Sequence, residues 1–237
     1  MGLSVEEKLM YEVMHALYDS GIPISFKGSM VLKACLLEAG YTEETRHTVD
    51  IDANWYADVP PSDEMIRASL QEVIDNNHLD LIVGVFRPHG MGRSAGLELM
   101  TRTAGERLFT MDIDIDRPDI PTKVYAVQGI QFRGAAPIQM IADKVLVVST
   151  DKIFRRIKDL IDLYYLSKVF PFNAAEVIRA LHNSRRSIGS FDGFLHRGDE
   201  LEHAYVKFRF EGGVKKPAFK EVYGSVMSYI EDVLPDR

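Results

Sequence analysis

Carboxylates recur at every second position in two segments of the chain that alternate between polar and apolar residues. The segments are 48–56 and 108–116, and their carboxylates are Asp50 and Asp52 in the first and Asp112, Asp114 and Asp116 in the second. In a strand, alternate side chains point to the same face, roughly 6–7 Å apart along the backbone. Like charges at that spacing repel one another unless solvent or a cation neutralises them. Each segment therefore predicts either an exposed acidic face or a metal site.

Magnesium suits such a pair of strands. Mg²⁺ is held in proteins by one or two carboxylates, and phosphate oxygens and water complete its octahedron. Two such ions about 4 Å apart need about three carboxylates. Asp50 and Asp52 supply two, and a neighbouring strand supplies the third as Asp112 or Asp114, between which the sequence does not decide. We predict a Mg²⁺ or Mn²⁺ site whose ligands come from these four residues.

A Gly-Ser pair precedes the first acidic strand. Gly28 allows a phosphate to approach the backbone closely. Ser29 is predicted to cap a helix over residues 30–39, where its hydroxyl and the free N–H groups of the first turn would bind phosphate oxygens. Phosphates held between a helix N-terminus and two metals are the apparatus of nucleotidyl transfer, in which one metal activates the attacking hydroxyl and the other carries the triphosphate.

Each of these motifs has a simpler interpretation. A serine after a glycine is usually only a helix cap. An Asp-x-Asp strand is more often a solvated face than a metal site. A charged edge strand also protects a sheet against aggregation. The order of the motifs along the chain is what favours the metal-nucleotide interpretation.

The elements that must position these residues follow from periodicity and turn signals. A helix over 4–20 begins with a capping box of Ser4 and Glu7. The further expected helices are 30–39, about 60–76, 137–148 and 151–169, and the expected strands are 24–26, 48–56, 79–86, 96–101, 108–116 and 125–132. Residues from 173 onward are predicted to be mainly helical, with 205–210 as a possible strand. The fold class is therefore α+β, with a mixed sheet in residues 1–135 and a mainly helical domain over 136–237.

Composition limits where the protein is expected to be found and what it is expected to bind. The 237 residues are 46% hydrophobic and 27% charged, as in a globular protein, and no apolar run is long enough to cross a bilayer. The single cysteine, Cys35, excludes an intrachain disulfide and favours the cytoplasm. Residues 1–143 hold 12 Lys and Arg against 22 Asp and Glu, whereas residues 144–220 hold 15 against 9. This uneven charge is typical of a protein that binds cations in its acidic part and polyanions in its basic part. The alternative is a chance distribution of solvated surface charge.

Two further motifs lie in the C-terminal half. They are IADKVL, which contains Lys144, and RIKDLIDLY, which runs from Arg156 to Tyr164. Together with Gly28-Ser29, Asp50-Ile51-Asp52, Met111-Asp112-Ile113 and the tail AFKEVYGSVMSYIEDVL, they resemble the AbiEii-type nucleotidyltransferase family over about residues 24–235. That family is the toxin half of many bacterial toxin–antitoxin and abortive-infection systems.

The resemblance implies a polymerase-β-like nucleotidyltransferase domain followed by a helical domain. It implies metal binding by Asp50 and Asp52 with Asp112 as third carboxylate and Asp114 as its alternate, and phosphate binding by Gly28 and Ser29. In the C-terminal half it implies an essential pair of Lys144 and Asp162, with Lys144 on the triphosphate. Nucleotide or acceptor contacts are implied for Arg156, Lys158 and Asp159. The ordinary alternative for residues 151–169 is an amphipathic helix with i, i+4 ion pairs of Arg155 with Asp159 and Lys158 with Asp162.

The implied reaction transfers NMP from an NTP to an acceptor hydroxyl, with pyrophosphate as leaving group. The implied acceptor is RNA, such as the 3′ end of tRNA, and a separate antitoxin protects the cell. A second hypothesis keeps the chemistry but makes the acceptor a small molecule or a protein side chain. A third is a catalytically weak nucleotide-binding module that acts through a protein partner.

Overall fold

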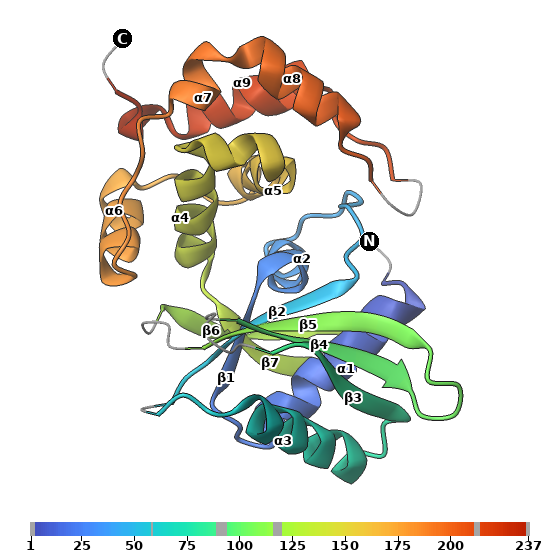
Figure 1. The fold of residues 1–237 in the computed structure, drawn as a ribbon. Coiled ribbons are helices and arrows are strands. Elements are labelled where there is room, and N and C mark those ends of the chain that lie inside the picture. The colour runs from blue at the N-terminus through green and yellow to red at the C-terminus, as the bar shows by residue number, and fades with distance from the viewer. Residues whose placement is uncertain (1–2, 58, 89–93, 116–119, 211–213, 236–237) are drawn as a thin grey trace. The chain divides into compact units, whose positions relative to one another are not determined.

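The computed structural model describes residues 3–57, 59–88, 94–115, 120–210 and 214–235 (Figure 1). Asp116, predicted to continue the second acidic strand, lies outside these residues. The chain divides into two compact units. The sheet unit comprises residues 1–38 and 48–135, and the helical unit comprises residues 39–47 and 136–237. The loop 39–47 therefore clusters with the helical unit, although it lies within the domain limits of 1–135 expected from sequence.

In the described part of the sheet unit, seven strands form one mixed sheet in the order β3-β4-β5-β2-β1-β7-β6. The strands are β1 (Ile24–Lys27), β2 (Asp50–Trp55), β3 (Leu81–Arg87), β4 (Ser94–Thr101), β5 (Arg107–Ile115), β6 (Thr122–Val127) and β7 (Ile130–Ala135). The pairs β2 with β5 and β1 with β7 are parallel, and the other neighbouring strands are antiparallel. The predicted mixed sheet is confirmed.

Strand alternation decides which side chains of β2 and β5 are buried. Ile51, Ala53, Met111 and Ile113 are fully buried, whereas Asp50, Asp52, Asp112 and Asp114 keep partial exposure. One face of each strand therefore contributes to the hydrophobic core, and the opposite face carries the carboxylates.

Three helices pack on this sheet: α1 (Val5–Asp19), α2 (Gly28–Glu38) and α3 (Asp63–Asn76). Helix α1 packs on β1 and β7, α2 on β2 and β6, and α3 on β3. The predicted capping box of α1 is confirmed, because Ser4 accepts from the Glu7 backbone and Glu7 accepts from the Ser4 backbone. Glu7 also binds Lys33 of α2 at 2.6 Å, so one buried carboxylate both caps α1 and joins it to α2.

Two predictions for the sheet unit are wrong. The single strand expected over 125–132 is a hairpin of β6 and β7, whose turn residues Gln128 and Gly129 have φ of 51° and 86°. Two positive φ values are the requirement of a tight hairpin turn, and Gln is not a typical residue there. Ser29 was expected as the N-cap of its helix. Instead α2 begins at Gly28, directly from β1, and Ser29 is buried in the first turn.

The helical unit is built from six α-helices and two 3₁₀ turns in its described residues. They are α4 (Pro137–Val148), η1 (Asp151–Arg155), α5 (Ile157–Ser167), α6 (Ala174–Asn183), α7 (Asp192–His196), α8 (Gly198–Lys207), α9 (Phe219–Tyr229) and η2 (Glu231–Val233). Helix α4 packs against α5 and α6, and α5 packs against α9. Figure 1 shows α4 and α5 as successive, differently directed helices.

Two predictions also fail in the helical unit. The single helix expected over 151–169 is broken at Arg156, which has φ −126° and ψ 46° and separates η1 from α5. The possible strand over 205–210 is absent, because Tyr205 lies in the last turns of α8. Its hydroxyl donates to the Pro217 carbonyl at 2.7 Å, a tertiary contact that local alternation does not reveal.

Candidate functional site

A single row of register partners crosses five strands of the sheet unit. It runs from Lys27 of β1 to Asp52 of β2, then to Asp112 of β5, Gly96 of β4 and Arg87 of β3. Register partners point to the same face of a sheet. Asp52 and Asp112 therefore lie side by side on the acidic face, with a cation on either side of the pair.

The Asp52 carboxylate lies directly against Gly28, the first residue of α2. A Cβ atom on Gly28 would stand 2.1 Å from Asp52 Oδ2, and Gly28 has φ +72°. Glycine is thus required twice, for the backbone conformation and for the space that the carboxylate occupies. A negative charge beside the first turn of a helix is also stabilised by the helix dipole.

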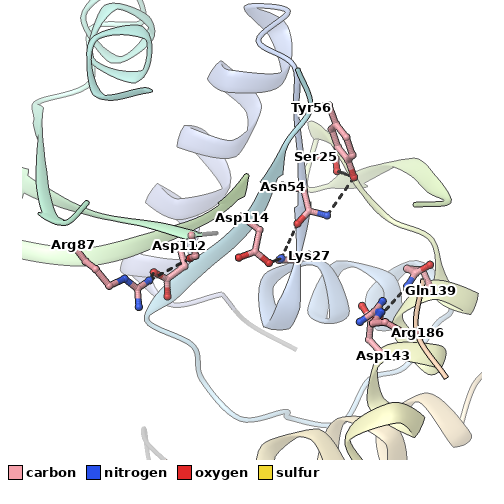
Figure 2. Close-up of polar contacts among 11 residues, drawn as sticks. Ser25, Lys27, Asn54, Tyr56, Arg87, Asp112, Asp114, Gln139, Asp143 and Arg186 are labelled. Atoms are coloured by element: carbon pink, nitrogen blue, oxygen red, sulfur yellow. Dashed lines mark hydrogen bonds and ion pairs between the residues drawn. The ribbon is translucent and has the colours of Figure 1, made fainter. Parts of the chain in front are cut away.

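Two carboxylates of the acidic face, Asp112 and Asp114, have cationic partners, and Asp50 has a hydroxyl partner; Figure 2 shows the two cations. Lys27 Nζ lies 2.5 Å from Asp114 Oδ2 and 2.7 Å from Asn54 Oδ1. Arg87 binds Asp112. Asp50 accepts a hydrogen bond of 2.6 Å from the Thr48 hydroxyl.

The chemistry of the acidic face is compatible with Mg²⁺ that takes its remaining ligands from a nucleotide. Among the described residues, no three Asp, Glu, His or Cys side chains converge on one point as a complete metal site. Mg²⁺ does not need three, because one or two carboxylates suffice when phosphates supply the other ligands. Asp52 and Asp112 are a pair of this kind. Because Gly28 has no Cβ atom, the Asp52 carboxylate can lie beside the start of α2. The larger ligand set with Asp50 and Asp114 stays a prediction.

A second charged cluster is buried in the helical unit. Lys144 of α4 is only 7% exposed, and its Nζ lies 2.6 Å from Asp159 Oδ1 and 3.0 Å from Asp162 Oδ2 of α5. Asp162 also accepts from the Arg46 guanidinium at 3.0 and 3.1 Å, and Asp159 accepts from Arg156 Nε at 2.6 Å. Two lysine or arginine charges therefore face each buried carboxylate.

These ion pairs keep the buried groups charged. Burial alone would raise the pKa of Asp162, but Arg46 and Lys144 outweigh it and hold that pKa at about 2. Burial would likewise lower the pKa of Lys144, and its two carboxylate partners raise it instead. Burial also opposes ionisation of Asp159, whose pKa is nevertheless lowered by Lys144 and Arg156.

The structure groups the site residues expected from sequence into two sets. Gly28, Ser29 and the four aspartates lie in the sheet unit, and Lys144, Arg156, Lys158, Asp159 and Asp162 lie in the helical unit. The resemblance implies a triphosphate contact for Lys144, whereas here its ammonium holds two buried carboxylates. The expected i, i+4 pairs of the helix are replaced by the pairs of Asp159 with Arg156 and of both aspartates with Lys144.

Sequence reasoning missed three partners of the carboxylates, Lys27, Arg46 and Arg87, and also Asn54, whose side-chain oxygen accepts from Lys27. Asn54 had a usable signal, because it follows Asp50 and Asp52 at every second position of β2. Arg46 and Arg87 come from a loop and from a bulged strand end, where no local period predicts direction.

Comparison with family models matches residues 9–224 to the nucleotidyl transferase AbiEii toxin of type IV toxin–antitoxin systems. The chain belongs to the AbiEii nucleotidyltransferase toxin family. Membership in the AbiEii family implies a nucleotide substrate and an antitoxin partner. No curated protein gave a significant match. None of the described helices is long and apolar enough to span a membrane.

Three solved structures resemble the AbiEii chain to different degrees. MenT4, a nucleotidyltransferase toxin from Mycobacterium tuberculosis, has 18% identity and a TM-score of 0.61, with 95% of this chain and 81% of MenT4 covered. A nucleotidyltransferase-like antigen from Paracoccidioides brasiliensis has 13% identity and a TM-score of 0.46, with 88% and 95% covered. The Megavirus polyadenylate synthase has 14% identity and a TM-score of 0.44, with 71% and 33% covered. The likeness to MenT4 supports the shared fold.

Proposed function

We propose that this AbiEii-family toxin is a Mg²⁺- or Mn²⁺-dependent enzyme that transfers NMP from an NTP to a hydroxyl of RNA, such as the 3′ end of tRNA. The observation that carries the proposal is the pair Asp52 and Asp112, adjacent in register, with Asp52 packed on Gly28 at the start of α2. A metal held by two carboxylates beside free helix N–H groups is suited to a triphosphate.

In this reaction the acceptor oxygen attacks the α-phosphorus, and the bond between that phosphorus and the bridging oxygen breaks. Pyrophosphate leaves, and the hydroxyl proton passes to solvent. Asp52 and Asp112 would hold the metal, with Asp50 beside them, and the bound metal supplies positive charge to the triphosphate. Gly28, Ser29 and the first N–H groups of α2 would hold phosphate oxygens. Asp114 is held by Lys27 in a pair that is about one fifth exposed, whereas Asp112 is in a more exposed pair with Arg87, so we propose Asp112 rather than Asp114 as the third ligand.

The charge distribution supports a polyanionic acceptor. Residues 144–220, all in the helical unit, hold 15 Lys and Arg against 9 Asp and Glu. Several exposed basic side chains of this stretch, among them Lys152 and Arg155, have the charge that phosphate backbones attract.

The test incubates the protein with Mg²⁺ or Mn²⁺, each α-labelled NTP in turn and total cellular RNA. Asp52→Asn removes one proposed metal ligand, and Asp80→Asn, at an exposed position, is the matched control. We expect labelled RNA with wild type and with Asp80→Asn, but not with Asp52→Asn. RNA whose 3′ ends are oxidised with periodate before the reaction should not become labelled. Pyrophosphate release without labelled RNA would overturn the RNA acceptor. Nucleotide binding without pyrophosphate release would favour the binding-module hypothesis.

A further inference from the structure

A β-bulge places Arg87 on the acidic face. Strand β3 pairs with β4 as Val85 with Leu97 and then Arg87 with Gly96, so one residue of β3 is extra at this step. Without the extra residue Phe86 would pair with Gly96, and Arg87 would point to the other face. The bulge thus turns a cation towards the carboxylates.

Gly96 keeps the space between Arg87 and Asp112 open. Gly96 is the register partner of both residues. A Cβ atom on Gly96 would stand 3.0 Å from Arg87 Cβ and 2.7 Å from Phe86 Cζ. Any larger residue here would crowd the bulged strand end and push the arginine away from Asp112.

The two cations of the acidic face differ in how firmly they are held (Figure 2). Lys27 is 23% exposed and bound at two points, Asp114 and Asn54. Arg87 is 51% exposed and has Asp112 as its charged partner, with a longer contact of 3.4 Å to the Ser94 hydroxyl. Asp112 is itself 41% exposed. Exposed ion pairs contribute little free energy, so the guanidinium can exchange Asp112 for another anion.

We propose that Arg87 is a polyphosphate-binding residue, held on Asp112 until a divalent metal takes that carboxylate. This inference rests on the proposed function and deepens it. Metal and arginine compete for the same carboxylate. When the metal binds Asp112, the guanidinium is released beside the site, where its planar donors match phosphate oxygens in pairs. Metal loading therefore exposes the cation that the incoming triphosphate needs.

The test compares Arg87→Ala with Arg102→Ala. Arg102 is a matched control because it is 46% exposed, lies in the same unit and binds an exposed carboxylate, Asp75. Binding of Mn²⁺ alone is measured by electron paramagnetic resonance. Binding of each α,β-methylene NTP, which cannot release pyrophosphate, is measured at saturating Mn²⁺.

We expect opposite effects of Arg87→Ala on the two ligands. Mn²⁺ alone binds about two- to fivefold more tightly, the range of an exposed ion pair. The nucleotide analogue binds about ten- to hundredfold more weakly, the range of a hydrogen bond to a charged group. Arg102→Ala changes neither. Without metal, Asp112→Asn tightens nucleotide binding, and Arg87→Ala in the same chain removes that gain.

Other outcomes overturn the inference. If Arg87→Ala weakens both ligands, Arg87 only supports the geometry of Asp112. If it changes neither, Arg87 is a solvated rim charge. If wild type binds no nucleotide analogue with Mn²⁺, the proposed function itself fails, which separates that failure from failure of the role of Arg87.

Discussion

Replacing Gly28 with alanine tests whether the position of the Asp52 carboxylate matters. The new Cβ would stand 2.1 Å from Asp52 Oδ2, against an ordinary contact of 3.4 Å or more. The carboxylate must therefore move by about 1.3 Å, the difference between these two distances. A misplacement of about 1 Å at a reacting centre costs about a hundredfold in rate. We expect a loss of that size in kcat/KM for NTP, together with weaker Mn²⁺ binding.

The matched control is Gly21→Ala. Gly21 has φ +74°, close to the +72° of Gly28, but a Cβ there meets nothing within 4 Å. Both variants should lose about 1–2 kcal/mol of stability from the left-handed backbone conformation of alanine. Only Gly28→Ala displaces the carboxylate. The assay is pyrophosphate release with RNA present, alongside urea unfolding and Mn²⁺ binding for both variants.

The comparison separates the effect of backbone strain, which both variants share, from the displacement of the Asp52 carboxylate, which only Gly28→Ala causes. If Gly28→Ala keeps kcat/KM within about threefold of Gly21→Ala, a shift far below the hundredfold expected of misplacement, then Asp52 does not act from the position described. Equal Mn²⁺ affinity in the two variants would contradict the role of Asp52 as a metal ligand, whatever the rate.

Three further predictions concern the buried cluster and the acidic face. Lys144→Met leaves two buried carboxylates under-compensated and should lower the melting midpoint by roughly 10 °C, whereas Lys152→Met, at an exposed position, should change it by no more than about 2 °C. If Lys144→Met keeps the wild-type melting midpoint but binds nucleotide more weakly, Lys144 contacts the triphosphate instead. The pKa of Asp162 is lowered to about 2, below its unfolded value, so its contribution, on the order of 2 kcal/mol, is present above about pH 4 and is lost as pH falls towards 2. Urea unfolding between about pH 4 and about pH 2 should show that the free energy of unfolding falls less in Asp162→Asn than in wild type. Equal decreases in the two proteins would contradict this role of Asp162. Asp112→Asn should weaken Mn²⁺ binding at least about tenfold, whereas Asp114→Asn should stay within about threefold, since we propose only Asp112 as a ligand. The reverse order would make Asp114 the third carboxylate.

Local patterns predicted the elements well where a short-range rule applies. The capping box of Ser4 and Glu7 and the helix from Pro137 to Val148 were predicted because their signals lie within the elements. The alternation of β2 and β5 likewise predicted which residues share a face. The break at Arg156 was missed, because its residue type does not reveal a departure from helical φ and ψ.

The site depended on information that a local pattern does not contain. The sequence named the carboxylates, but register decides that Asp52 is adjacent to Asp112 while Asn54 is adjacent to Asp114. The buried cluster shows the same limit. Burial of Asp162 demands compensating charge, yet nothing near it in the sequence indicates Arg46, 116 residues away, as its partner.

The most direct test of the central claim measures pyrophosphate release from NTP by wild type and Asp52→Asn, with RNA and Mg²⁺ and then with excess chelator. If the acidic face of the sheet unit performs nucleotidyl transfer, wild type releases one pyrophosphate for each NMP incorporated, chelator stops the release, and Asp52→Asn is slower by about a hundred- to a thousandfold. Release by Asp52→Asn at the wild-type rate, or release that persists in chelator, would contradict the account.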